Sequence, residues 1–138
     1  MSLDLIQEFA RLLQELHEHC QDIRGTVVAT QDGFILSASG ELDNDTAAAT
    51  AVHLTEVAEQ HLSLLRSARC IDQIVWTDNS IWYITRLADE YILMALAEST
   101  CTPGMLRLVS RNIDDAVRTL LGHARAEVES LNQATTEA

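Results

Sequence analysis

Residues 91–97 read Tyr-Ile-Leu-Met-Ala-Leu-Ala, an apolar run that no charged side chain interrupts. A strand that alternates apolar and polar residues buries one face, whereas a strand that is apolar throughout buries both. The run is far too short to span a membrane as a helix and follows a turn signal at 88–90. It therefore predicts a central strand in a sheet that is covered on both faces.

Two segments before this run also read as strands. Residues 81–87 are rich in β-branched and aromatic side chains, and residues 70–77 alternate in polarity. Asp72 and Gln73 in the latter segment indicate an edge strand, because charged and polar groups there discourage unwanted pairing. The three segments form a predicted meander.

A hairpin and a helix precede the meander. Residues 26–30 and 34–39 flank Asp32-Gly33, which favours a tight turn between two strands. Residues 3–20 carry apolar side chains at helical spacing, and Ser2 or Asp4 can cap the start of that helix.

The alanine-rich segment between the hairpin and the meander predicts a helix that Asp43, Asn44 or Asp45 can cap. Its apolar arc is broad for a helix that covers one surface. It is either a well-buried core helix or a helix packed on both its own sheet and a partner's helix, and the periodicity leaves both interpretations open. The main stripe comprises Ala47, Ala51, Leu54, Ala58, Leu62 and Leu65.

A last helix begins at Pro103, which suits the first helical position. The length of 138 residues suits one domain, 1–138, with an ordered core at about 3–130 and a frayed tail at 131–138. Three cysteines far apart in sequence, and the lack of a signal-peptide pattern, predict a cytoplasmic protein. The net charge of −12 argues against nucleic acid and anionic membranes as partners.

The densest group of potential ligands is Leu-His-Glu-His-Cys at 16–20. His17 and Cys20 can share a helix face, but a zinc site needs three or four convergent ligands and no second cluster follows. Phosphate-binding glycine loops and nucleophile elbows are also lacking. We therefore assign no catalytic residue, metal or cofactor, and expect a non-enzymatic protein.

The ordered set of elements resembles the Roadblock family, which includes dynein light chains of the roadblock type and bacterial partners of small Ras-like GTPases. The resemblance spans about residues 3–125. It rests on Gly25 before the first strand, the Asp32-Gly33 turn, the alanine-rich helix and the Gly104-x-x-Arg107 start of the last helix.

The resemblance implies an α/β fold of the α+β sandwich type: a five-stranded antiparallel sheet of strand order 2-1-5-4-3, with the middle helix on one face and the other two helices on the opposite face. It also implies a homodimer, built from the third strands and the middle helices. The implied interface comprises Ala47, Ala51, Leu54, Ala58, Leu62, Leu65, Ile74 and Trp76, and candidate partner contacts are His53, Glu56, Glu59, Gln60 and Arg66.

The function implied is a dimeric regulator or scaffold of a Ras-like small GTPase or another signalling protein. Two alternatives stay open. One is a structural adaptor of a larger signalling or motor assembly, without nucleotide dependence. The other is a small-molecule sensor, which an apolar cavity between the sheet and a helix would favour.

Overall fold

The computed structural model describes residues 3–66 and 69–137, so the predicted cap Ser2 lies outside the described residues. The helices and strands follow the predicted order along the chain. They are α1 (Leu3–His19), β1 (Ile23–Thr30), β2 (Ile35–Gly40), α2 (Asn44–Leu64), β3 (Asp72–Trp76), β4 (Ser80–Leu87), β5 (Tyr91–Glu98) and α3 (Pro103–Glu137).

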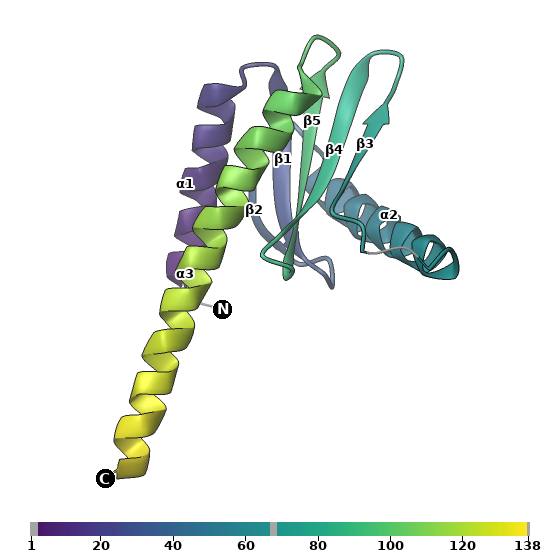
Figure 1. Cartoon of the computed structure of the whole chain (residues 1–138). Coiled ribbons are helices and arrows are strands. Elements are labelled where there is room, and N and C mark those ends of the chain that lie inside the picture. Colours follow the sequence, from purple (N-terminus) through teal and green to yellow (C-terminus); the bar gives the residue numbers. More distant parts are fainter. Residues whose placement is uncertain (1–2, 67–68, 138) are drawn as a thin grey trace.

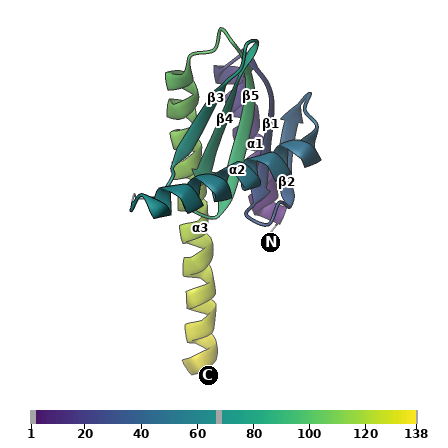
Figure 2. The same ribbon diagram turned by 90° about the vertical axis from the view of Figure 1, so that its right-hand side faces the viewer.

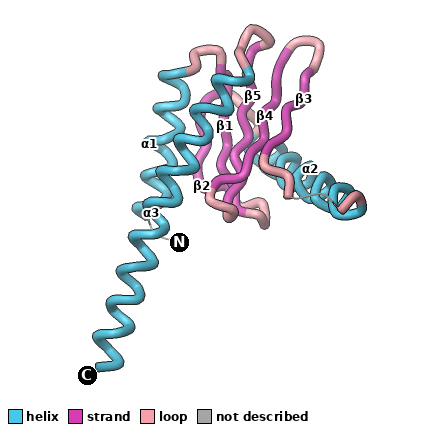
Figure 3. Tube along the Cα trace, viewed as in Figure 1, coloured by secondary structure: helices cyan, strands magenta, loops and turns pink. Residues whose placement is uncertain are grey.

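The five strands form one antiparallel sheet of order β2-β1-β5-β4-β3, which confirms the predicted topology (Figure 3). β5 lies at the centre, and every residue from Tyr91 to Ala97 is buried. Met94 pairs with Val27 of β1 on one side and with Ile84 of β4 on the other. The unbroken apolar run is explained by this position, because helices cover both faces of the strand.

Figure 1 shows α1 and α3 side by side on one face of the sheet and α2 on the other. Phe9 and Leu16 of α1 and Leu106 of α3 are fully buried in the larger core cluster, together with Tyr83 and Leu93 of the sheet. The Phe9 ring meets Tyr91 edge to face, with centroids 5.1 Å apart. The arrangement of helices predicted from the resemblance is confirmed.

The α2 helix crosses the strands on the opposite face (Figure 2). Asp43 caps it, accepting a hydrogen bond from the Thr46 backbone N–H at 3.3 Å. Its alanines pack on Val27, Ile84 and Met94. Because the alanine side chains are small, this helix approaches the sheet closely, and the core cluster between α2 and the sheet contains little apolar side chain from the helix.

The α3 helix continues through Glu137, whereas the sequence predicted a frayed tail at 131–138. Its C-terminal half projects beyond the sheet (Figure 1). The segment 121–133 contains no proline and is rich in alanine, glutamate and leucine, which favour helix without tertiary contacts. Val128 and Leu131 are 56% and 69% exposed on this projecting part.

Candidate protein-protein interface

The edge strand β3 pairs only with β4 among the described strands. Its residue pairs set the direction of each side chain. Ile74 lies opposite Tyr83 and Trp76 opposite Ile81, so both point to the face that carries α1 and α3. Ile74 and Trp76 are 39% and 60% exposed, which leaves an apolar strip along the open edge.

The backbone of β3 offers hydrogen-bonding groups at this edge. The Ile71 carbonyl accepts from the Arg86 N–H at 3.2 Å, and the Thr77 N–H donates to the Ser80 carbonyl at 2.9 Å. In an antiparallel ladder, residues that bond to a given neighbour alternate along the strand. The backbone groups of the residues between, Asp72, Ile74 and Trp76, therefore point away from β4.

The structure decides which side of α2 faces the sheet, a question that the sequence left open. Ala47, Ala48, Ala51 and Thr55 are buried. Ala47 and Ala51, both predicted interface residues, therefore lie against the sheet of their own chain. The Thr55 hydroxyl is satisfied by the Ala51 carbonyl at 2.7 Å.

The C-terminal part of α2 extends past β3, beyond the edge of the sheet (Figure 2). Of the predicted interface residues here, Ala58 and Leu62 are half-buried and Leu65 is 76% exposed. Leu54, which precedes the overhang, is also half-buried. Leu64, which widens the apolar arc in the sequence but is not among the predicted interface residues, is 80% exposed. Apolar side chains therefore lie on an overhanging helix end.

An apolar hollow of about 450 Å³ lies beside the other half of α2. Leu54 and Thr50 border it from the helix, Val75 from β3 and Trp82 from β4. The hollow opens at the C-terminal end of β3. The overhanging end of α2 leaves the sheet near the N-terminal end of that strand. There the Gln73 side chain donates to the Leu54 carbonyl at 3.3 Å.

Glu59 joins the overhanging end of α2 to the sheet. Its Oε1 accepts from the Arg86 guanidinium at 3.0 Å and from the Cys70 backbone N–H at 3.1 Å. Arg86 and Glu59 are mostly buried, so this contact is shielded from water more than the surface pairs are. Among the candidate partner contacts, Glu59 is therefore already engaged by Arg86 and Cys70 of its own chain. The other four, His53, Glu56, Gln60 and Arg66, are exposed.

Of the histidine and cysteine cluster at the end of α1, Cys20 is buried in the core, His17 is half-buried and His19 is exposed. His17 Nε2 lies 2.5 Å from the Ser39 hydroxyl, and that hydroxyl also bonds to Thr26. Burial raises the pKa of the Cys20 thiol, and the Asp22 carboxylate adds to this shift. Among the described residues, no group of three or more histidines, cysteines and carboxylates is placed to hold a metal ion.

A sequence model of the Roadblock/LC7 domain matches residues 9–97. The chain belongs to the Roadblock/LC7 family. The match covers most of α1, all of α2 and nearly the whole sheet, so the predicted resemblance is confirmed. No curated protein sequence matches the chain.

Solved Roadblock-fold structures resemble the chain over most of its length. Myxococcus xanthus MglB has a TM-score of 0.80 at 13% identity, covering 89% of this chain and 94% of its own. The gliding protein mglB of Thermus thermophilus has a TM-score of 0.76 at 16% identity, covering 86% of this chain and 92% of its own. A Roadblock/LC7 domain from Streptomyces avermitilis has a TM-score of 0.76 at 18% identity, covering 81% and 96%. At such identities the likeness establishes the fold alone.

In the part of the chain that the structure describes, none of the helices has the length and apolar character needed to cross a membrane. Three features of this Roadblock chain are open to a partner: the free edge of β3, the overhang of α2 and the hollow beside it. The interface residues predicted from the sequence include Ile74 and Trp76 but not Val75 and Leu64, which are also exposed. The alternation within 70–77 was a signal for Val75, since it puts that residue on the face opposite Ile74.

Proposed function

We propose that this protein is a dimeric, non-enzymatic regulator or scaffold of a Ras-like small GTPase in the cytoplasm. The observation that carries the dimer is the match between the free edge of β3, the overhang of α2 and the hollow. The single chain leaves backbone groups unpaired at the first, apolar side chains exposed on the second and an apolar hollow open at the third. One two-fold axis between two copies covers all three.

The axis passes through Ile74. Antiparallel pairing of β3 with its copy about this residue uses every outward backbone group, because Asp72 then lies opposite Trp76 of the second copy. The N-terminal end of one β3 meets the C-terminal end of the other. The overhanging α2 of each copy is thereby carried over the hollow of its neighbour, where Leu62 and Leu65 can meet Val75 and Trp82.

The partner surface is the exposed side of paired α2 helices, which carries His53, Glu56, Gln60 and Arg66. Regulation needs no catalytic group in this chain. A GTPase populates more than one switch conformation, and a protein that binds one of them more tightly shifts the population toward it. The family membership supports this role, and one of the structures that this chain resembles is of MglB with a tetrameric arrangement.

Binding of a candidate GTPase in its GDP-loaded and GTP-analogue-loaded forms tests the proposal, followed by hydrolysis rates with and without the protein. We expect unequal affinities for the two forms. Glu56→Arg should weaken binding, whereas Glu129→Arg, the same charge change on the projecting part of α3, should not. Failure of the small GTPases of the source cell to bind contradicts the proposal. Equal affinity for both nucleotide forms favours the structural adaptor instead.

The hollow beside α2 is the observation that favours a small-molecule sensor as a second candidate. It is apolar and lies between the sheet and a helix. In the proposed dimer the neighbouring α2 covers it. A strictly monomeric protein at micromolar concentration would leave the hollow open and favour the sensor.

A further inference from the structure

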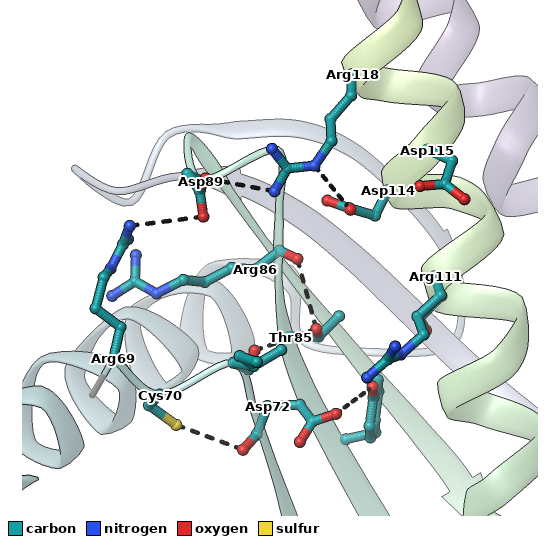
Figure 4. A pocket seen from close by; sticks show the side chains of 13 residues that line it. Arg69, Cys70, Asp72, Thr85, Arg86, Asp89, Arg111, Asp114, Asp115 and Arg118 are labelled. Carbon is teal, nitrogen blue, oxygen red and sulfur yellow. Dashed lines mark hydrogen bonds and ion pairs between the residues drawn. The ribbon is translucent and has the colours of Figure 1, made fainter. Parts of the chain in front are cut away.

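A second cavity, of about 390 Å³, lies where the β3 edge of the sheet meets α3. Its wall comes from three segments that are far apart in sequence: residues 69–72 before and at the start of β3, residues 83–89 of β4 and the following turn, and residues 110–118 of α3. Figure 4 shows these segments converging.

The cavity brings arginines from three segments of an acidic protein together, beside four aspartates, Asp72, Asp89, Asp114 and Asp115. The chain has no lysine and nine arginines against 21 carboxylates. Four of those arginines line this one cavity, and they come from all three segments (Figure 4). They are Arg69, Arg86, Arg111 and Arg118.

Most of the neighbouring carboxylates already have partners. Asp72 accepts from the Tyr83 hydroxyl at 3.0 Å and pairs with Arg107 of α3 at 3.1 Å. Asp114 accepts from the Ala88 N–H at 2.6 Å and from Arg118 Nε at 2.9 Å. Asp89 accepts from Arg118 Nη2 at 3.3 Å, and Asp115 is exposed.

Donors, by contrast, are left over. Arg111 makes no hydrogen bond or ion pair with any described residue, and its guanidinium points from α3 toward β3 (Figure 4). Arg118 keeps its Nη1 group uncommitted, and Arg69 pairs with Asp89 only at 3.6 Å. Ser110 in the α3 wall is 2% exposed, and its hydroxyl is without a partner among the described residues. A guanidinium only donates, so a ligand here has to accept.

We propose that this cavity binds a small soluble molecule bearing a phosphate group, held by Arg69, Arg111 and Arg118. Arg111 can donate a pair of parallel N–H bonds to a tetrahedral dianion with several acceptor oxygens. The uncommitted Nη1 group of Arg118 and the weakly paired Arg69 add further donors. The volume exceeds that of a phosphate, and Ile71 and the Tyr83 ring give the organic part of a phosphate ester an apolar wall. None of the four proposed GTPase contacts lines this cavity, whereas Asp72 lies both in its wall and at the β3 edge that is proposed to pair in the dimer.

Calorimetric titration of the full chain with pyrophosphate at physiological ionic strength tests the site. The Nε–H signals of the arginines in NMR spectra report where the ligand binds. We expect saturable binding that moves the Arg111 and Arg118 signals. Arg111→Gln should weaken binding about 10- to 100-fold, since hydrogen bonds to charged groups are lost. It removes no hydrogen bond or ion pair within the described residues, and an unchanged melting temperature verifies that the variant folds.

Arg125→Gln is the matched control. It changes the charge equally on the same helix, but Arg125 pairs with Glu90 and does not line the cavity. Its affinity for pyrophosphate should equal that of the unmodified protein. The proposal is overturned if pyrophosphate shows no saturable binding, or if both variants weaken binding equally, which indicates general charge attraction.

Discussion

Replacing Ile74 by proline should dissociate the proposed dimer while leaving each chain folded. The Ile74 N–H points away from β4, so its loss breaks no bond of the intrachain ladder. Proline is tolerated on edge strands where the missing N–H faces outward. The substitution therefore acts on the contact between copies.

The size of the effect follows from the two-fold axis. With Ile74 opposite its own copy, the two residues exchange two N–H to carbonyl bonds, and the substitution removes both. Each is worth about 0.5–1.5 kcal/mol net, so the dimer loses about 1–3 kcal/mol, or roughly 5- to 150-fold in dissociation constant. The two proline rings also meet across the axis, which adds to the loss.

Sedimentation equilibrium over a concentration series measures this change, and thermal unfolding of the monomer checks the fold. Ile74→Ala is the control, because it keeps the N–H and shortens a side chain that is 39% exposed. We expect it to weaken the dimer less than proline does. A proline variant that dimerises as tightly as the unmodified protein would refute edge-to-edge pairing of β3.

Three further predictions concern stability. Burial, together with the negative charge of Asp72, raises the pKa of Tyr83 to about 12 from an ordinary value near 10, so the native state holds this proton longer than the unfolded chain. The contribution of this shift to the free energy of unfolding is complete below about pH 10, is lost as pH rises toward 12, and amounts to at most about 3 kcal/mol. Denaturant unfolding measured across this pH range should show a shallower decline in stability for Tyr83→Phe than for the unmodified protein. Gly40→Ala should destabilise the fold severely, because φ is +76° and the new Cβ would collide with the Arg24 carbonyl oxygen. Gly122→Ala, in open space on α3, should stabilise by up to about 1 kcal/mol. A Gly40→Ala variant that is as stable as the unmodified protein would contradict the geometry. Ala51→Leu should cost about 1–3 kcal/mol by forcing α2 off the sheet, and a melting temperature that does not fall would argue against that close packing.

Periodicity sufficed for the elements and for the places of two strands in the sheet, whereas the full strand order was implied by the family resemblance. The apolar run of β5 identified a strand with two covered faces, and the polar residues of β3 identified an edge. These signals are local, since the polarity of the side chains along a strand depends on which faces of that strand are buried. The ends of elements were less certain: β1 begins at Ile23, three residues before the predicted start, because Ile23 pairs with Ala97 of β5.

The α2 helix shows where local patterns stop. Its apolar arc indicated contacts on more than one side, but Ala51 and Leu62 look alike in a helical periodicity. Only the crossing of α2 over the sheet separates them, because Ala51 lies over β-strands and Leu62 lies toward the overhanging end (Figure 2). The direction in which a helix crosses a sheet depends on packing along its whole length, which no short window of sequence contains.

Local patterns along the chain were enough to predict the elements and the central and edge strands, because burial periodicity is a property of the linear chain. The order of the elements indicated the family, and the resemblance to that family implied the layers. The surfaces on which the proposals rest emerge only when the chain folds. In sequence the arginines are scattered and form no stripe, yet Arg69, Arg86, Arg111 and Arg118 border one cavity. They meet because β3, β4 and α3 are brought together by apolar contacts elsewhere in the core, and those contacts place the charges without being encoded near them.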